Sequence, residues 1–225
     1  MFNLKQILGC VATLAIVSLP TQAEQLVLDS FNYNPALSLE ATPLLGQSVQ
    51  TDTVTSIETG ALADYTLTWL SGAAVDTVKG NKFDSGSLSY NEEDAANGSL
   101  KIEYYLPGGF TLDFTGFSYF YFDVVSIDGS GGFDVQLSLE DKDGTVISAG
   151  YNIVAPGMFL ASFDSMLPGA DFDFTQVAKA TAFITSDGNG DDFTLAEVGL
   201  VPEPSSLAVL GLGLLGLGLR RRKLI

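Results

Sequence analysis

The sequence contains no histidine and a single cysteine, Cys10, in 225 residues. The chain beyond Cys10 therefore forms no disulfide of its own, and catalysis by Ser-His-Asp or Cys-His groups is excluded. A zinc site with imidazole or thiolate ligands is excluded in the same way. Carboxylate and carbonyl oxygens remain as metal ligands, and they suit Ca²⁺ or Mg²⁺. Stability must therefore come from a hydrophobic core.

Basic residues are also scarce. Ten Lys and Arg stand against 27 Asp and Glu, which gives a formal net charge of −17. Half of the basic residues lie at the two ends of the chain, namely Lys5, Arg220, Arg221, Arg222 and Lys223. The central segment 24–201 is therefore strongly acidic. Nucleic acid is not expected as a partner, because phosphate binding needs clustered Lys and Arg. The acidity favours solubility and divalent cations.

The C-terminal segment 201–225 combines three features in a set order. Pro202-Glu203-Pro204 ends the preceding strand, because each proline lacks an N–H and has a fixed φ. Residues 205–219 are apolar and can enter a bilayer as a helix, in which the backbone satisfies its own hydrogen bonds. The basic residues 220–223 cannot cross, so they hold the C-terminus in the cytoplasm.

This apolar segment is short for a permanent anchor. Fifteen helical residues span about 22 Å, less than the ~30 Å hydrocarbon core of a bilayer. Its four glycines, at positions 211, 213, 216 and 218, weaken a helix further. A lasting tail anchor or a C-terminal core helix is the alternative interpretation. The length and composition favour a temporary anchor that a protease recognises.

The segment resembles the PEP-CTERM sorting signal of Gram-negative bacteria. The matching residues are Val201-Pro202-Glu203-Pro204, the Leu/Gly helix 207–219, and Arg220, Arg221 and Arg222. The resemblance implies that exosortase, a membrane-embedded cysteine protease-transpeptidase, processes the chain at the inner membrane and directs it to the cell surface. Proteins of this kind accompany exopolysaccharide production and biofilm formation. The resemblance implies no activity for the other residues.

The N-terminus has the pattern of a secretory signal peptide. Lys5 gives a minimal positive region, and Ile7–Leu19 is the apolar stretch. We expect cleavage between Ala23 and Glu24, because a small residue precedes that bond. Cys10 closes a lipoprotein-like box, Ile7–Cys10, which is the alternative. It lies too early, since most of the apolar stretch follows the cysteine.

The segment 24–200 is predicted to be one all-β domain. Apolar and polar residues alternate over Tyr65–Trp69, Leu100–Tyr104 and Phe133–Leu139, which is typical of half-buried antiparallel strands. Trp69, Ile102, Phe133, Val135 and Leu137 are expected to point inward. The continuously apolar Tyr119–Val125 indicates a central strand. Further strands are expected near Leu26–Phe31, Val146–Val154, Met158–Phe163, Val177–Ile184 and Phe193–Leu200. Asp143-Gly144 predicts a hairpin turn.

Ten or more short strands without repeats predict a single antiparallel β-sandwich of the jelly-roll type. The order of strands resembles that of galactose-binding-like jelly rolls, which include many carbohydrate-binding modules. The resemblance rests on an opening strand at Leu26–Phe31 and a closing strand at Asp191–Val198. It implies that these two strands lie beside each other.

One acidic loop is a candidate calcium site. Asp187-Gly-Asn189-Gly-Asp191 begins like an EF-hand loop, but Asp192 stands at the glycine position and Val198 at the glutamate position. An acidic, glycine-rich turn is the alternative. If a calcium ion binds, Asp187, Asp191 and Asp192 are its expected ligands. No other cofactor is expected. The acidic segment Glu140–Asp143 is interpreted as a solvated hairpin tip.

Two functions remain open. The first is a non-catalytic surface or matrix protein that binds exopolysaccharide, with exosortase and, transiently, the inner membrane as further partners. Exposed aromatic rings could stack on sugars, and five aromatic residues were weighed both for this role and for the core: Trp69, Tyr104, Tyr105, Tyr119 and Tyr121. The second is a secreted glycosidase or polysaccharide lyase. It needs two carboxyl groups about 5–10 Å apart in a deep groove.

Overall fold

The computed structural model describes residues 25–32, 38–43, 48–56, 59–73, 77–83, 86–93, 95–129, 131–166, 171–186 and 190–203. Within these ranges the regular structure is β-strand, with three short 3₁₀ turns: η2 (Pro107–Gly109), η3 (Phe163–Ser165) and η4 (Phe174–Gln176). The strands are β1 (Leu26–Asp29), β2 (Ser38–Ala41), β3 (Val49–Thr55), β4 (Leu62–Ser71), β5 (Val78–Phe83), β6 (Ser87–Glu92), β7 (Asn97–Tyr105), β8 (Phe117–Asp128), β9 (Phe133–Asp141), β10 (Val146–Ile153), β11 (Gly157–Ser162), β12 (Val177–Ser186) and β13 (Asp192–Pro202).

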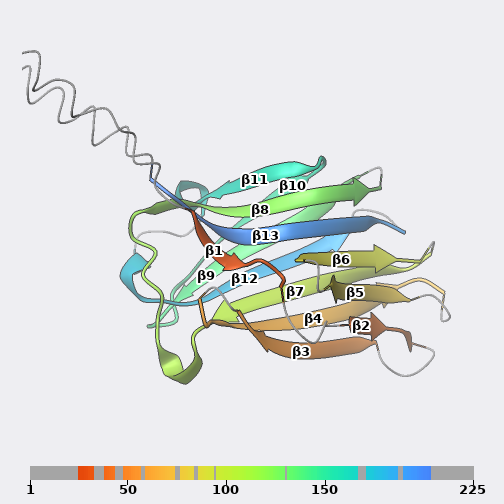
Figure 1. Ribbon diagram of the computed structural model, residues 1–225, viewed down its shortest axis with the longest axis horizontal. Helices are drawn as coiled ribbons and strands as arrows, with labels where there is room; N and C mark the ends of the chain where they lie inside the picture. Colours follow the sequence, from red (N-terminus) through yellow and green to blue (C-terminus); the bar gives the residue numbers. More distant parts are fainter. Residues whose placement is uncertain are drawn as a thin grey trace, which may run out of the picture. The chain divides into compact units, whose positions relative to one another are not determined.

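The strands form two antiparallel sheets that pack face to face (Figure 1). One sheet has the order β11-β8-β13-β6-β5-β2, and β1 also pairs with β13. The other has the order β10-β9-β12-β7-β4-β3. The all-β sandwich predicted for 24–200 is therefore confirmed.

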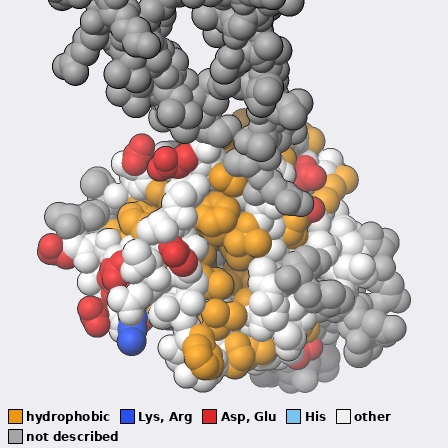
Figure 2. Space-filling view, turned by 60° about the vertical axis from the view of Figure 1, so that its left-hand side comes forward, with side chains coloured by type: hydrophobic (Ala, Val, Ile, Leu, Met, Phe, Trp, Pro, Cys, Tyr) orange, Lys and Arg blue, Asp and Glu red, His pale blue; other side chains and the backbone are white. Residues whose placement is uncertain are grey.

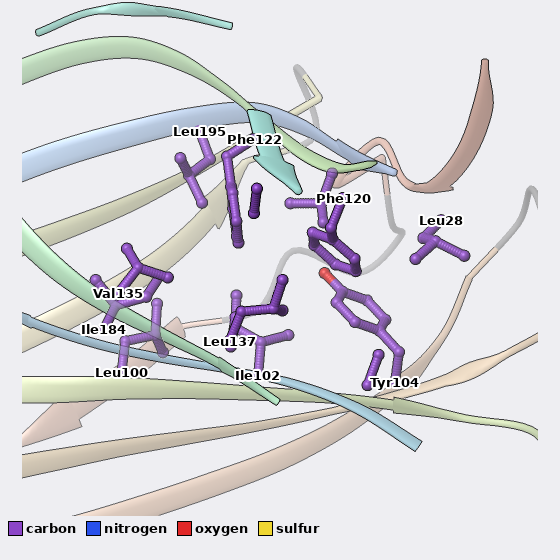
Figure 3. Packing of buried hydrophobic residues seen from close by; sticks show 14 of the residues in the cluster. Leu28, Leu100, Ile102, Tyr104, Phe120, Phe122, Val135, Leu137, Ile184 and Leu195 are labelled. Carbon is purple, nitrogen blue, oxygen red and sulfur yellow. The ribbon is translucent and has the colours of Figure 1, made fainter. Parts of the chain in front are cut away.

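Alternation along the strands explains the layers. In β9 every second residue is buried, from Phe133 to Asp141, while Asp134 and Gln136 are exposed. Leu137 on this strand and Ile102 on β7 are fully buried. Figure 3 shows their side chains meeting Phe120 and Phe122, which come from β8 of the facing sheet. The core thus lies between the sheets, as is usual for sandwiches.

The first and last strands pair with each other. Leu26 lies opposite Leu200, and Val27 lies opposite Gly199, in an antiparallel ladder. β13 lies centrally in its sheet, since β8 pairs with its other edge (Figure 1). The adjacency of the opening and closing strands, which the resemblance to galactose-binding-like domains implied, is confirmed.

Four strands went unpredicted: β2, β3, β5 and β6. Each has weak alternation or many polar residues; β3, for example, reads VQTDTVT and is largely exposed. Such sequences form strands because a neighbouring strand supplies hydrogen-bond partners, as β4 does for β3. Of the residues expected to point inward, Trp69 is only partly buried, although it packs against the core.

The predicted hairpin joins β9 and β10. The Gly144 N–H donates to the Asp141 carbonyl (3.0 Å), and Gly144 has φ 83°. That conformation is easily reached only by glycine. The Asp141 carboxylate accepts from the backbone N–H of Asp143 (3.0 Å) and of Thr145 (2.8 Å). The turn is therefore fixed by its own side chain, and its tip, at Lys142 and Asp143, is exposed as expected.

Acidic side chains are spread over the face seen in Figure 2, with hydrophobic side chains exposed between them. Among the residues that the structure describes, no helix is long and apolar enough to cross a membrane. The segment 205–219, expected to span the bilayer, lies outside the described residues, as does the signal peptide 1–23.

Candidate functional site

The outward face of the six-stranded sheet carries an exposed aromatic residue. In β12, Ala180, Ala182 and Ile184 are buried, so the residues between them point outward. One of these is Phe183, whose side chain is 39% exposed. The pairing of the strands places it between Gln136 of β9 and Lys101 of β7. An apolar ring thus lies near the middle of a polar face.

A shallow pocket of about 530 Å³ lies beside this ring. It is lined by Asp134, Val135, Gln136, Gly150, Tyr151, Asn152, Phe183 and Thr185, which belong to the three strands β9, β10 and β12. Gly150 lies opposite Gln136, and its lack of a side chain leaves space there. A Cβ atom at Gly150 would come within 3.6 Å of the Gln136 amide oxygen. The hollow therefore depends on glycine at this position.

Polar groups surround the ring with defined geometry. The Asn152 amide donates to the Asp134 carboxylate (2.9 Å), which orients both side chains. Gln136 is exposed and makes no hydrogen bond with the part of the chain that the structure describes. One flat apolar surface with amide and carboxylate groups around it is suited to a ligand that has an apolar face and hydroxyl groups at its edges.

The rest of this face is occupied by contacts within the protein. Lys179 pairs with Glu140 (2.8 Å), and Lys101 pairs with Glu103 (2.7 Å). The hydrogen bond to Glu140 raises the pKa of Lys179, so this lysine stays charged. These ion pairs leave little free hydrogen-bonding capacity on β7 and on the first half of β12. The pocket beside Phe183 is therefore the better candidate for binding.

The pocket contributes a single carboxyl group. Asp134 is the one acidic residue among the described residues that line it. Glycoside hydrolysis by the usual route needs two carboxyl groups on either side of the scissile bond. The pocket does not supply such a pair.

The aromatic residues singled out from the sequence lie elsewhere. Tyr104 and Tyr121 are fully buried. Trp69, Tyr105 and Tyr119 are partly buried, and the Tyr105 hydroxyl donates to Asp64 (2.9 Å). Phe183 was missed, although the sequence contains its signal: it stands at a position where the alternation of its strand calls for a polar residue. The roles of Gln136, Gly150 and Asn152 depend on strand pairing, which the sequence does not reveal.

The acidic loop near the closing strand is only partly described. Asp187 lies outside the described residues. Asp191 is buried, and the Asp192 carboxylate accepts from the Glu92 backbone N–H (3.0 Å). Within the described ranges, no group of three or more acidic residues could hold a metal ion. Calcium binding by Asp187, Asp191 and Asp192 stays a prediction.

Glu92 forms a buried carboxyl site that the sequence did not indicate. Its carboxylate accepts from the Tyr90 hydroxyl (2.5 Å), the Gly98 N–H (2.7 Å) and the Ser186 hydroxyl (2.9 Å). Burial raises the pKa of Glu92, while these hydrogen bonds oppose the rise. The site joins β6, β7 and β12, so it links the two sheets. It is occupied by its own partners and is structural.

The expected sorting residues fall at the edge of the described chain. Pro202 is the last residue of β13 and lies opposite Phe117 of β8. Glu203 follows it and is exposed. Outside the described residues lie Pro204, Arg220, Arg221 and Arg222, together with the expected signal cleavage site at Ala23 and Glu24.

These features define a sandwich domain of the exported type, followed by a C-terminal address. The PEP-CTERM protein-sorting motif matches residues 200–223. The chain thus carries the PEP-CTERM signal, which marks it as an exosortase-sorted surface protein. No curated protein matches the sequence significantly.

Several solved structures are similar in outline. The family 11 carbohydrate-binding module of the cellulosomal cellulase Lic26A-Cel5E of Clostridium thermocellum is 14% identical, with a TM-score of 0.40, over 80% of this chain and 95% of that chain. TmCBM61, solved in complex with β-1,4-galactotriose, is 12% identical with a TM-score of 0.32, over 80% and 100% of the two chains. An agarase, AgWH50C, is 13% identical with a TM-score of 0.42, over 80% and 25%. Similarities this distant carry no conclusion about a ligand.

Proposed function

We propose that this protein is displayed at the cell surface after two cuts and there binds polysaccharide without catalysis. The first cut falls after Ala23, and the second falls near Pro202-Glu203-Pro204. In the second cut one peptide bond breaks, and the new acyl end passes to water or to an amine. Binding takes place at the pocket beside Phe183. The observation that carries the binding proposal is this exposed ring within a hollowed, polar sheet face.

The chemistry of the pocket fits a sugar ring. The C–H face of a pyranose can lie on the Phe183 ring, while its hydroxyl groups reach Gln136, Asn152 and Asp134. Phosphate and other anionic ligands are disfavoured, because Asp134 is the charged group in the pocket and the protein as a whole is acidic. We therefore expect a neutral polysaccharide. A shallow site with one ring implies modest affinity for each sugar unit.

The test uses the segment 24–202 on a glycan array, followed by titration with the best neutral oligosaccharide. Phe183→Ala should weaken binding about tenfold if the ring contributes about 1.4 kcal/mol, and Gln136→Ala should weaken it less. Leu160→Ala is the matched control, because Leu160 is 44% exposed but lies on β11 of the other sheet. Equal binding by all three variants would place the ligand elsewhere.

The processing part of the proposal has its own test. The intact mass of the surface form should correspond to a chain that starts at Glu24 and ends near Pro202. Recovery of a surface species that still ends in Arg220-Arg221-Arg222 and the residues after them would contradict it. A hydrolysis screen with the same oligosaccharides separates the rival function, because release of products would favour a glycosidase or lyase.

A further inference from the structure

The sorting signal and the folded domain share residues. The motif match begins at Leu200, whereas β13 continues to Pro202. Leu200 is fully buried, and it pairs with Leu26 on one side and with Phe120 on the other. The start of the signal is therefore part of the hydrophobic core. Leu200, Val201 and Pro202 serve two purposes.

The end of β13 is held tightly. At Gly199, a Cβ atom would come within 2.3 Å of the Leu26 carbonyl oxygen and 2.7 Å of the Tyr121 ring. One edge of the strand pairs with β8 as far as Pro202, and the other pairs with β1 as far as Leu200. Pairing becomes one-sided only over the last two residues. Detachment of the strand end must therefore begin at Pro202 and proceed toward Leu200.

Little free chain separates this strand from the membrane segment. Only Glu203 and Pro204 lie between Pro202 and the apolar stretch 205–219. Two extended residues span about 7 Å, whereas a domain of this length has a radius of gyration of roughly 16 Å. A membrane-embedded peptidase must bind chain on both sides of the bond that it cuts. With β13 fully paired, the residues on the N-terminal side are held in the sheet.

We propose that detachment of the end of β13 from β8 controls processing of the sorting signal. The cut then proceeds from a locally opened state in which Val201 and Pro202, and for part of the time Leu200, have left the sheet. Cleavage of such a state follows its equilibrium population when opening and closing are fast. The processing rate is thus set by the stability of this strand end. This inference depends on the proposed processing by exosortase.

The test follows processing of the full chain by pulse-chase in cells that contain exosortase. Leu200→Ala removes the buried anchor of the strand end, so the processing rate should rise by about 5- to 30-fold, the change in the open population for one or two kcal/mol. Leu195→Ala is the matched control, because Leu195 is also buried in β13 but lies where the strand pairs with β6. It lowers global stability without loosening the last residues, and processing should stay near that of the wild type.

A second variant avoids any damage to the core. Four residues, Gly-Ser-Gly-Ser, inserted between Val201 and Pro202 keep the Pro-Glu-Pro segment intact and move it away from the sheet. This insertion should also raise the processing rate, and adding Leu200→Ala to it should have no further effect. That loss of sensitivity distinguishes local opening from general unfolding.

Each outcome decides the matter. Equal acceleration by Leu200→Ala and Leu195→Ala would show that global unfolding governs processing, which overturns the proposal. Equal rates in all variants would show that the cut does not need strand opening, and slower processing of the insertion variant would show that the enzyme reads the folded domain. Both overturn the proposal while processing itself stands. If no variant is cut, the insertion included, then the proposed processing is what fails.

Discussion

Leu26 and Leu200 lie opposite each other in neighbouring strands, so the first strand after the signal peptide supports the last strand before the sorting signal. The contribution of β1 comes mostly from one residue. Leu28 is fully buried, whereas Leu26 is 37% exposed. Both lie within the four-residue strand β1. The strand therefore offers a matched pair of leucines.

We expect Leu28→Ala to lower the free energy of unfolding by about 2–5 kcal/mol, because it leaves a cavity in the core. Leu26→Ala should cost at most about 1 kcal/mol. Urea denaturation of the segment 24–202 measures both. Equal losses would mean that β1 is held by its backbone pairing with β13 rather than by the burial of Leu28.

The same contrast is expected on β9. Leu137 is fully buried between the sheets, and its neighbour Gln136 is exposed on the outward face. Leu137→Ala should cost about 2–5 kcal/mol. Gln136→Ala should stay within about 0.5 kcal/mol, although it weakens polysaccharide binding. A large loss of stability in Gln136→Ala, seen in thermal or urea unfolding, would show that this side chain has a structural role.

A hydrogen bond inside the core gives a third prediction. The hydroxyl of Tyr65, which is fully buried, donates to the Asp29 carboxyl group (2.5 Å). Tyr65→Phe leaves that buried carboxyl group with one donor fewer, which should cost about 1–3 kcal/mol.

Tyr105→Phe is the control for this change. It removes a similar bond to Asp64 (2.9 Å) that lies on the partly exposed outer face. Water can replace the lost donor there, so the cost should be about 1 kcal/mol or less. Equal costs for the two variants would show that burial of the Asp29 pair adds nothing.

The sequence predicted the parts of this fold that depend on local pattern. Strong alternation identified β9, and the Asp143-Gly144 pair identified its hairpin with β10. β3 escaped because its residues are mostly polar, and such a strand exists only through its pairing with β4. Strand propensity depends on neighbours that the sequence does not name.

The candidate binding site was harder to predict for a related reason. Its residues come from three strands, and the registers between those strands bring Gly150, Gln136 and Phe183 into one row. No motif encodes such a row. The sorting signal was recognised because all its parts are contiguous. Its overlap with β13 could not be recognised, because the prolines suggested that the strand ends before them, whereas Pro202 is its last residue.

Two adjacent glutamates should affect stability in opposite ways as the pH changes. Burial raises the pKa of Glu92. The hydrogen bonds from Thr77, including one from its backbone N–H (2.9 Å), lower the pKa of Glu93, whose side chain is 47% exposed. The folded state therefore prefers the protonated form of Glu92 and the ionised form of Glu93.

The sign of each contribution follows from linkage. For Glu92 the folded state binds more protons than the unfolded state, so its contribution to stability is fully present below the unfolded pKa of about 4.3 and is lost as the pH rises through the higher folded pKa. For Glu93 the contribution is present above that unfolded value and is lost as the pH falls through the lower folded pKa. Urea denaturation of wild type, Glu92→Gln and Glu93→Gln from pH 3 to 7 measures both effects. The stability of wild type minus that of Glu92→Gln should fall as the pH rises, whereas wild type minus Glu93→Gln should rise. Parallel pH profiles for wild type and Glu92→Gln would mean that the hydrogen bonds from Tyr90, Gly98 and Ser186 offset the burial of this carboxyl group completely.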